Sequence, residues 1–372
     1  MAGALKRPSG WRGESPYLSP AVSRTQGGAL VGMTYKRAGV DHAGKVKAIG
    51  ALVSQVSFAR RGKGAPIGPK AGFAGFVRFG KYAIAICTDS VGTKHLIARA
   101  LNKFETIGID CVAMNVNDMI CHGAEPLAFV DYVAMPRPDP AITRAVGIGL
   151  NKAAEEANVT LAGGETAIVP DLLREFDLSG TAVGVAKIKE IIDGSTAKPG
   201  DVLLAIESSG VHCNGLTLVR KIVEANHLSY KRKVAGLKAP SLGMELLTPT
   251  RLYVRPIMQL LKSVRPTGMA NITGGGLRNL LRIRYGLGFE VDSPIRPQPI
   301  FAGLQEWGDV SDHEMYQTFN MGHGFAVLVR PDDEAETRRV LRAHFTTKVI
   351  GQATRGGGVR VPELEGVRYE EY

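Results

Sequence analysis

The sequence predicts an α+β protein of the α/β type with two domains. Its 372 residues suffice for about two domains of ordinary size. With 44% hydrophobic and 22% charged residues, the chain can bury substantial cores. Short strands alternate with helices in two successive blocks, and a Lys-Pro-Gly-Asp turn at 198–201 separates them. We therefore expect an N-terminal domain over residues 33–196 and a C-terminal domain over residues 197–372.

The elements of the first block follow from β-rich runs and from the spacing of apolar residues. Apolar positions at mostly helical spacing predict a helix over 106–122, and a second helix is expected over 142–158. Strands are expected over 82–87, 127–134, 159–162 and 178–188. The strand over 159–162 is expected to end at a loop that begins with Gly163 and Gly164.

The second block repeats the alternation. We expect strands over 202–207 and 324–329, and helices over 215–226 and near 249–261. A Gly-Gly-Gly run at 274–276 predicts a loop between them.

Residues 1–32 differ from the rest of the chain. They are rich in Pro, Gly and Ser, carry more basic than acidic residues and show no periodic apolar pattern. They also lack the apolar core of a secretory signal. We expect a flexible basic extension.

The net charge of +11 favours an anionic partner. Aromatic residues make up only 6% of the chain and compact basic runs are few, so we expect a phosphorylated small molecule and no nucleic acid. A basic nucleic-acid-binding protein is the alternative from another class. No apolar run approaches the roughly 18 residues that span a bilayer, so we expect no membrane partner. The four scattered cysteines, without a CxxC pair, suit a cytoplasmic protein.

The first candidate motif is Thr-Asp-Ser-Val-Gly-Thr-Lys at 88–94. A carboxylate at a strand end, followed by Gly, Thr and Lys, offers a metal ligand, a close backbone approach and a cation for phosphate. The candidate ligands are Asp89, Gly92, Thr93 and Lys94. The alternative is a strand and a tight turn with a solvated lysine.

The second motif lies on the predicted helix over 106–122. Asn115 and Asp118 are three residues apart, so they share a helix face and can present oxygen ligands to magnesium. Asn117 and Gly123 complete the candidates. The alternative is an ordinary polar helix face, and His122 is interpreted as a helix-end residue rather than a ligand.

A Gly-Gly-Glu-Thr run supplies the third motif, with Gly164, Glu165 and Thr166 as candidates. Asp89, Asp118 and Glu165 together are three carboxylates at the ends of elements and are the predicted metal ligands. Phosphoryl transfer needs cations that neutralise phosphate charge, so the residues predict a magnesium–nucleotide site.

These three motifs together resemble the ATP-binding family that includes aminoimidazole ribonucleotide synthetase, formylglycinamidine ribonucleotide synthase, selenophosphate synthetase, thiamine-phosphate kinase and a hydrogenase-maturation protein. Residues 118–126 match its D-x4-G-A-x-P signature. Further segments resemble the phosphoribosylformylglycinamidine cyclo-ligase family in order and spacing, over about residues 35–354. These segments are 35–41, 208–215, 247–251, 271–276 and 318–322.

The resemblance implies ATP-dependent closure of formylglycinamidine ribonucleotide to aminoimidazole ribonucleotide, with ADP and phosphate released, in purine biosynthesis. It also implies magnesium, and a homodimer in which N-terminal mixed sheets, each a half-barrel with helices, pair. The C-terminal sheet would be covered by helices. Asp89, Asn115, Asp118 and Glu165 would hold magnesium and nucleotide, with Lys94 near the phosphates. The expected substrate-facing residues are Ser209, Gly210, His212, Asn214, Thr273, Gly274 and Gly275.

The chain departs from the family at Asn271, where bacterial members usually carry a histidine. An acid–base role does not transfer to Asn271, but its amide can orient substrate. His212 is the better candidate for proton handling. The alternative is a structural hydrogen bond within a loop. Lys94, His212 and Asn271 are therefore the predicted catalytic residues. A selenophosphate synthetase-like or formylglycinamidine ribonucleotide synthase-like activity is the alternative within the family.

Overall fold

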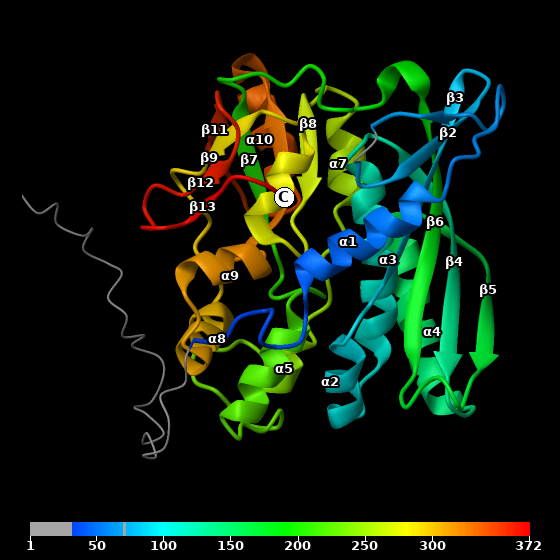
Figure 1. Ribbon diagram of the computed structural model, residues 1–372, viewed down its shortest axis with the longest axis vertical. Coiled ribbons are helices and arrows are strands. Elements are labelled where there is room, and N and C mark those ends of the chain that lie inside the picture. Colours follow the sequence, from blue (N-terminus) through cyan, green and yellow to red (C-terminus); the bar gives the residue numbers. More distant parts are fainter. Residues whose placement is uncertain (1–31, 70–71) are drawn as a thin grey trace, which may run out of the picture.

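The structure is a computed structural model that describes residues 32–69 and 72–372. The expected extension over residues 1–32 lies outside the described residues except for Gly32. Two sheets with helices around them form the two halves of the molecule in Figure 1. The predicted α+β class is confirmed, because both sheets mix parallel and antiparallel pairs.

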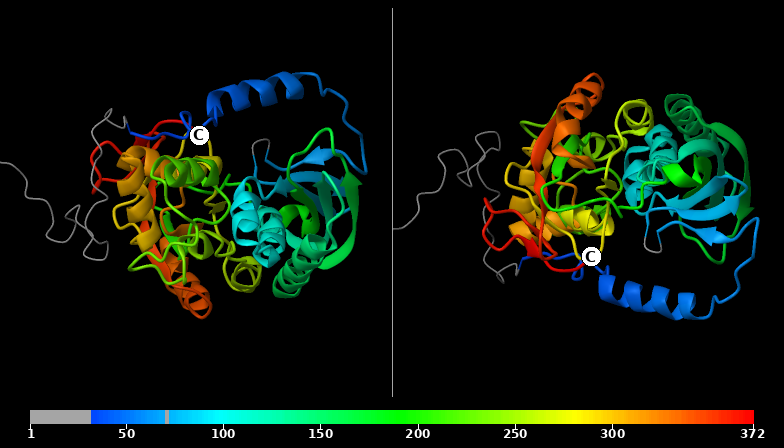
Figure 2. Two further views of the ribbon diagram at one scale, coloured as in Figure 1. Left: turned by 90° about the horizontal axis from the view of Figure 1, so that it is seen from below. Right: turned by 90° about the horizontal axis from the view of Figure 1, so that it is seen from above.

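The N-terminal half is built on a six-stranded sheet of order β1-β2-β3-β6-β4-β5. Its strands are β1 (Pro66–Ile67), β2 (Gly75–Phe79), β3 (Tyr82–Ser90), β4 (Glu125–Met135), β5 (Thr160–Ile168) and β6 (Asp177–Lys187). The helices are α1 (His42–Ser54), α2 (Lys94–Leu101), α3 (Glu105–Ile120) and α4 (Pro140–Ala157), with a 3₁₀ turn η1 (Ile188–Glu190). α3 packs on the inner face of the sheet, which holds the buried side chains Ala85 and Phe129. α1 runs along the outside of the molecule (Figure 2).

Two glycines allow α3 and α4 to pack closely against each other. There is no room for a side chain on Gly108 or Gly149, because a Cβ on either would clash with the backbone of the other helix. α4 begins where Asp139 accepts hydrogen bonds from the N–H groups of Ala141 and Ile142, and it ends at Asn158 with φ +56°. The close packing fixes α3, which carries two site candidates, against the sheet.

The C-terminal half is built on a seven-stranded sheet of order β13-β12-β9-β11-β7-β10-β8. Its strands are β7 (Val202–Glu207), β8 (Gly268–Asn271), β9 (Gly288–Glu290), β10 (His323–Val329), β11 (Thr347–Thr354), β12 (Val359–Arg360) and β13 (Arg368–Tyr369). The helices are α5 (Leu216–Ala225), α6 (Leu242–Leu246), α7 (Val254–Leu260), α8 (Pro299–Gly308), α9 (Asp312–Thr318) and α10 (Glu334–Arg342). The 3₁₀ segments are η2 (Gly276–Arg282) and η3 (Pro331–Asp333). The residues of β10 are all buried, so this strand lies in the core.

The strands and helices expected from the sequence are found, with two corrections. The expected loop after residue 162 is wrong, because β5 continues through Gly163 to Ile168 as a parallel partner of β4. The expected helix near 249–261 is too long, because α7 begins only at Val254. Residues 248–253 form no regular element, and Thr250 there donates its N–H to Asp110 across the domain boundary. The boundary between residues 196 and 197 falls between the last strand of one sheet and the first of the other.

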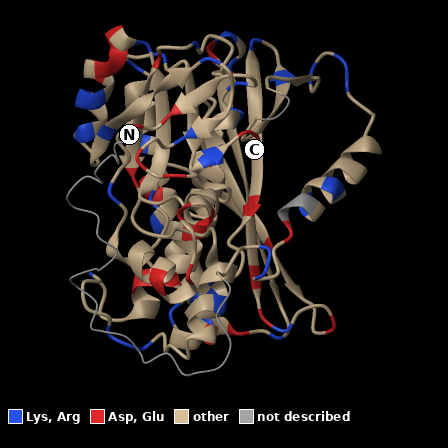
Figure 3. Cartoon of the chain, turned by 60° about the vertical axis from the view of Figure 1, so that its left-hand side comes forward, with Lys and Arg blue, Asp and Glu red and all other residues tan. Residues whose placement is uncertain are grey.

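Basic side chains are spread over the molecule. In the view of Figure 3, Lys and Arg lie on many elements of both halves and form no single stripe. Among the described residues, no helix is long and apolar enough to cross a membrane.

Candidate active site

The candidate site lies where β3 and α3 of the N-terminal half face β8 and the loop after it. The amide of Asn271, the last residue of β8, donates to Asp118 Oδ1 at 2.8 Å. This hydrogen bond joins a predicted metal ligand to a predicted catalytic residue across the domain boundary.

Asp89 and Asn115 lie beside each other at the carboxyl end of β3. Asp89 Oδ1 accepts the N–H of Ser90 at 2.7 Å. The amide of Asn115 donates to the carbonyls of Cys111 and Asp89, at 2.9 and 3.4 Å. Asn115 is 0% exposed, and its Oδ1 has no hydrogen-bond partner. An unpaired buried oxygen is costly, so the site is suited to a donor or a cation at that point.

Burial raises the pKa of Asp118 to about 7, although the hydrogen bond from Asn271 and the charge of Arg282 oppose the rise. Burial also raises the pKa of Asp89, against the Ser90 hydrogen bond and the charges of Lys45 and Arg282. The nearby charge of Asp89 further raises the pKa of Asp118. Two buried carboxylates close to each other favour a bound cation over two free charges.

Magnesium fits these oxygen donors. Two carboxylates and one amide oxygen are ligands that magnesium takes in proteins, and phosphate oxygens and water supply the rest. Within the described residues no group of three His, Cys, Asp or Glu side chains is placed to hold a metal. The donors at hand are therefore Asp89, Asn115 and Asp118, rather than three carboxylates.

The structure does not bring Glu165 to Asp89 and Asp118. Ser90 pairs with Ser179, Ser179 with Tyr132, and Tyr132 with Glu165. Glu165 is therefore three strand spacings from Ser90, about 14 Å. It also shares the outer face with Ser90, whereas the preceding Asp89 points to the inner face. Glu165 is exposed, and its carboxylate accepts the N–H of Thr166, while Gly164 lies on the inner face.

Asp131 is a site residue that the sequence analysis missed. It pairs with Gly180, which pairs with Asp89, so both carboxylates lie in one row on the inner face. The next residue in the row is Gly164, and a Cβ there would lie 2.6 Å from Asp131 Oδ1. Burial raises the pKa of Asp131. A charged residue in the middle of the apolar strand over 127–134 was the available signal.

Lys94 occupies a different position from the one expected. Its side chain is 0% exposed, and Nζ lies 2.8 Å from Asp110 Oδ2 and 3.0 Å from Oδ1. Nζ also donates to the carbonyl of Thr248 at 2.8 Å. An ammonium has three donors, and these contacts use them. The structure thus favours a role for Lys94 in joining the domains over a contact with phosphate.

Three further nucleotide candidates also have structural partners. Asn117 is 0% exposed; it donates to the carbonyl of Arg251 at 2.8 Å and accepts from Tyr253 N–H at 3.0 Å. The hydroxyl of Thr93 lies 3.2 Å from that of Thr217. Gly123 forms the turn after α3 with φ +72°. Gly92 differs, because it has φ +65° and open space where a Cβ would be, which leaves room for a ligand.

His212 is held in a loop by its ring nitrogen. Nε2 accepts the N–H of Ser209 at 3.1 Å, and the residue has φ +61° and is buried. Burial, with the charges of Lys94 and Arg251, lowers the pKa of His212 to about 3. A ring that stays neutral at physiological pH is a poor proton carrier. The structure supports the alternative of a structural hydrogen bond.

The two expected substrate loops meet each other. A Cβ on Gly274 would lie 2.9 Å from Asn214 Oδ1, so the loops at 208–215 and 273–276 are in contact. Asn214 Nδ2 is buried without a partner. The amide of Asn279 donates to the carbonyls of Thr273 and Gly274, both at 3.4 Å, and so helps to hold the second loop in place. The remaining candidates, Ser209, Gly210 and Gly275, lie in the same two loops; Ser209 Oγ donates to Pro249 O, and Asn320 holds the carbonyl of Gly210.

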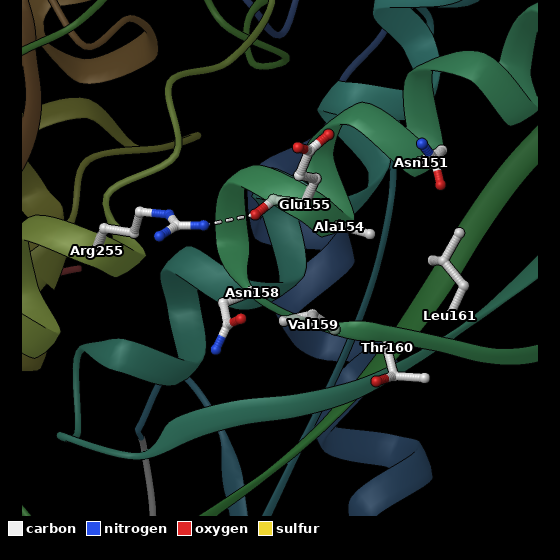
Figure 4. Close-up of a pocket in the computed structure, with 8 residues that line it drawn as sticks. All are labelled: Asn151, Ala154, Glu155, Asn158, Val159, Thr160, Leu161 and Arg255. Atoms are coloured by element: carbon white, nitrogen blue, oxygen red, sulfur yellow. Dashed lines mark hydrogen bonds between the residues drawn. The ribbon is translucent and has the colours of Figure 1, made fainter.

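A hollow outside the site lies between α4, the start of β5 and α7 (Figure 4). Its one basic residue, Arg255, donates to the carbonyls of Glu155 and Glu156 at 2.8 and 2.7 Å. Arg255 therefore caps the carboxyl end of α4 and holds the two halves together.

Comparisons with known proteins show which family the chain belongs to. Residues 72–186 match the family model of the AIR synthase related protein, N-terminal domain, and residues 198–362 match that of the C-terminal domain. The chain belongs to the AIR synthase family. It is 43% identical over 332 residues to the phosphoribosylformylglycinamidine cyclo-ligase of Methanosarcina acetivorans, covering 89% of this chain and 98% of the relative. The cyclo-ligase of Methanococcus maripaludis is 44% identical, with coverage of 86% and 92%.

Two solved structures show a similar fold. The structure of AaThiL complexed with AMPPCP and TMP has a TM-score of 0.61 and 14% identity, covering 89% of this chain and 97% of that one. T. maritima PurL complexed with ADP has a TM-score of 0.54 and 17% identity, covering 80% of this chain and 44% of that one. At these identities the likeness is one of fold.

Proposed function

We propose that this member of the AIR synthase family is a phosphoribosylformylglycinamidine cyclo-ligase. It closes formylglycinamidine ribonucleotide to aminoimidazole ribonucleotide and releases ADP and phosphate, in purine biosynthesis. The observation that carries the proposal is the identity of about 43% to cyclo-ligases, over nearly their whole length. A cytoplasmic location suits such an enzyme, and the four cysteines of the chain are buried and free.

The chemistry requires a better leaving group at the formamide carbon. ATP transfers its terminal phosphoryl group to the formamide oxygen, and ADP leaves with the electron pair of the broken P–O bond. The amidine-side nitrogen then attacks the activated carbon, closes the ring and expels phosphate. The enzyme's part is mainly to position the two substrates and to stabilise the developing charge.

Asp89, Asn115 and Asp118 would hold magnesium, with Gly92 close to the nucleotide. The support is the unpaired Oδ1 of the buried Asn115 beside two half-buried carboxylates. The ion would neutralise charge on the phosphates of ATP. Asp131 lies in the same row as Asp89 and would bind the nucleotide or the waters around the ion.

The ribonucleotide would bind at the loops 208–215 and 273–276. The support is the buried Nδ2 of Asn214, which has no partner among the described residues and offers a donor there, and the contact between the two loops. Asn271 would orient the substrate next to the metal carboxylate that it already contacts.

We also propose that the protein is a homodimer paired through the N-terminal sheets. The outer face of that sheet carries an exposed apolar patch, which we call the outer-face patch and which consists of Ile86, Val130, Tyr132 and Val183. Each of these side chains is at least 36% exposed. A contiguous apolar patch on a sheet face marks a protein interface.

The direct test mixes the purified full chain with Mg-ATP and formylglycinamidine ribonucleotide and measures aminoimidazole ribonucleotide and ADP. We expect both products in equal amounts. ADP without the ribonucleotide substrate, or no aminoimidazole product, would contradict the proposed activity. Selenide or formylglycinamide ribonucleotide in place of the substrate tests the other activities of the fold.

A further inference from the structure

The guanidinium of Arg282 lies at the domain boundary, and its contacts fix its orientation. Arg282 ends η2, the segment that follows the loop at 273–275. Its Cζ lies 3.7 Å from the centre of the Phe73 ring and 5.2 Å from that of Tyr372. Its Nη2 donates to the carbonyl of Gly72 at 3.0 Å. Stacking and this hydrogen bond together fix the plane of the side chain.

Phe73 connects Arg282 to the elements that carry the two carboxylates. The N–H of Phe73 donates to His122 Nε2 at 2.8 Å, and Cys87 Sγ lies 3.7 Å from the Phe73 carbonyl. Cys87 precedes Asp89 on the inner face of β3, and His122 follows Asp118 at the end of α3. The charge of Arg282 accordingly opposes the rise that burial causes in the pKa of both carboxyl groups.

Arg282 nevertheless forms no ion pair with any residue that the structure describes. A guanidinium has five N–H donors, and the hydrogen bond to Gly72 occupies one of them. A fixed cation thus lies beside the elements that carry Asp89 and Asp118, with donors to spare. Lys94, the cation expected there from the sequence, is committed to Asp110.

We propose that Arg282 is a catalytic residue that contacts the phosphoryl group during its transfer from ATP to the formamide oxygen. This inference rests on the proposed function. In the transfer, the bond from the terminal phosphorus to the bridging oxygen of ADP breaks and a bond to the formamide oxygen forms. Arg282 exchanges no proton; its charge stabilises the phosphoryl oxygens. Arg282 lies in η2, which directly follows the substrate loop at 273–275. Binding of the ribonucleotide to that loop would therefore position Arg282 for phosphoryl transfer.

The test compares Arg282→Gln and Arg282→Lys with a matched control, Arg265→Gln, in the full chain. Arg265 also donates to a carbonyl of the other domain, that of Lys189 at 2.8 Å, but away from the carboxylates. For Arg282→Gln we expect kcat to fall by about 10³-fold, because an arginine at transferred phosphate contributes at least that much. We expect KM for ATP and for the ribonucleotide to change by less than about threefold. Arg282→Lys should recover part of kcat, and Arg265→Gln should keep it.

A second measurement separates catalysis from packing. Mg-ADP with fluoroaluminate and the ribonucleotide mimics the transferred phosphoryl group, so the wild type should bind ADP more tightly with fluoroaluminate than without it. Arg282→Gln should lose this tightening and keep its affinity for Mg-ADP alone. Equal tightening in both, or a kcat equal to that of Arg265→Gln, would overturn the inference and leave the cyclo-ligase proposal standing. A wild type without cyclo-ligase activity would refute both.

Discussion

At the scale of single residues, the candidate site contains two buried polar atoms that have no partner among the described residues. Asn115 Oδ1 and Asn214 Nδ2 are buried without partners, one on each side of the domain boundary. Buried polar atoms are rarely left unpaired, and those that are often mark a place for a ligand. Asn115 Oδ1, an acceptor, lies beside the proposed metal carboxylates, where a cation would bind. Asn214 Nδ2, a donor, lies in a proposed substrate loop, where an anionic substrate would bind.

Asp118→Asn should reduce ATP turnover by at least about a hundredfold, because removing one metal carboxylate forfeits several kcal/mol of charge stabilisation. Asn at this position can still accept the hydrogen bond from Asn271, so the domain contact should remain. Turnover with Mg-ATP and circular dichroism of the variant would be measured together. Asp332→Asn, on the surface, is the control. Wild-type turnover in Asp118→Asn would rule out the metal assignment.

His212 predicts a pH dependence of stability. Its pKa is about 3 in the folded protein against an ordinary value of 6.5, so the unfolded chain binds more protons between these values. Stability therefore falls as pH falls through this window. Between pH 6.5 and 5 the loss from His212 is about 2 kcal/mol. Urea unfolding at pH 7 and pH 5 should show a smaller loss in His212→Gln than in the wild type; equal losses would contradict the low pKa.

At the scale of elements, the contact between α3 and α4 decides where the site residues of α3 lie. The close approach at Gly108 and Gly149 leaves no space for a methyl group. The site thus depends on positions that carry no functional side chain themselves.

Gly149→Ala should lower the free energy of unfolding by about 2 kcal/mol or more, because its Cβ would clash with the Glu105 carbonyl. Gly147→Ala on the same helix is the matched control, since nothing lies within 4 Å of a Cβ there. That change should stabilise the protein by up to about 1 kcal/mol. Urea unfolding of both variants checks the prediction, and two variants of equal stability would refute it.

Much of the element order was predictable from the sequence, because β-rich runs and helical spacing depend on local residues. The loop assigned to Gly163 and Gly164 was wrong because two glycines signal a turn, whereas pairing with β4 keeps the backbone extended. Motif position predicted that Asp89, Asp118 and Glu165 lie together. It was wrong for Glu165, whose place depends on strand order and register. Arg282 was missed because its place depends on a stack with Phe73, which is distant in sequence.

At the scale of the whole molecule, the site belongs to neither half alone. Asp118 meets Asn271, and Asn117 meets Arg251 and Tyr253, across the same boundary. Each half supplies one part of the chemistry, so the relative placement of the two sheets is itself a requirement for activity.

Val130→Asp should make the protein monomeric, because a charge in the middle of the outer-face patch would be buried in the proposed dimer at a cost of several kcal/mol. Sedimentation velocity of the wild type and the variant would compare their masses. Lys221→Asp, exposed on α5 of the C-terminal half, is a control for added negative charge. A wild type that sediments as a monomer would refute the proposed dimer.

The buried ion pair between Lys94 and Asp110 has a consequence for how the chain folds during translation. Asp110 Oδ1 receives both the N–H and the hydroxyl of Thr250 at 2.7 Å, and Lys94 needs the carbonyl of Thr248. During synthesis, the chain up to the end of β6 leaves the ribosome before residues 248–250 do. At that stage Lys94 and Asp110 lack their hydrogen bonds to Thr248 and Thr250. The N-terminal half can therefore collapse early, but its interior reaches its final form only once the segment at 248–250 has been translated. Folding of the first half is completed by the second.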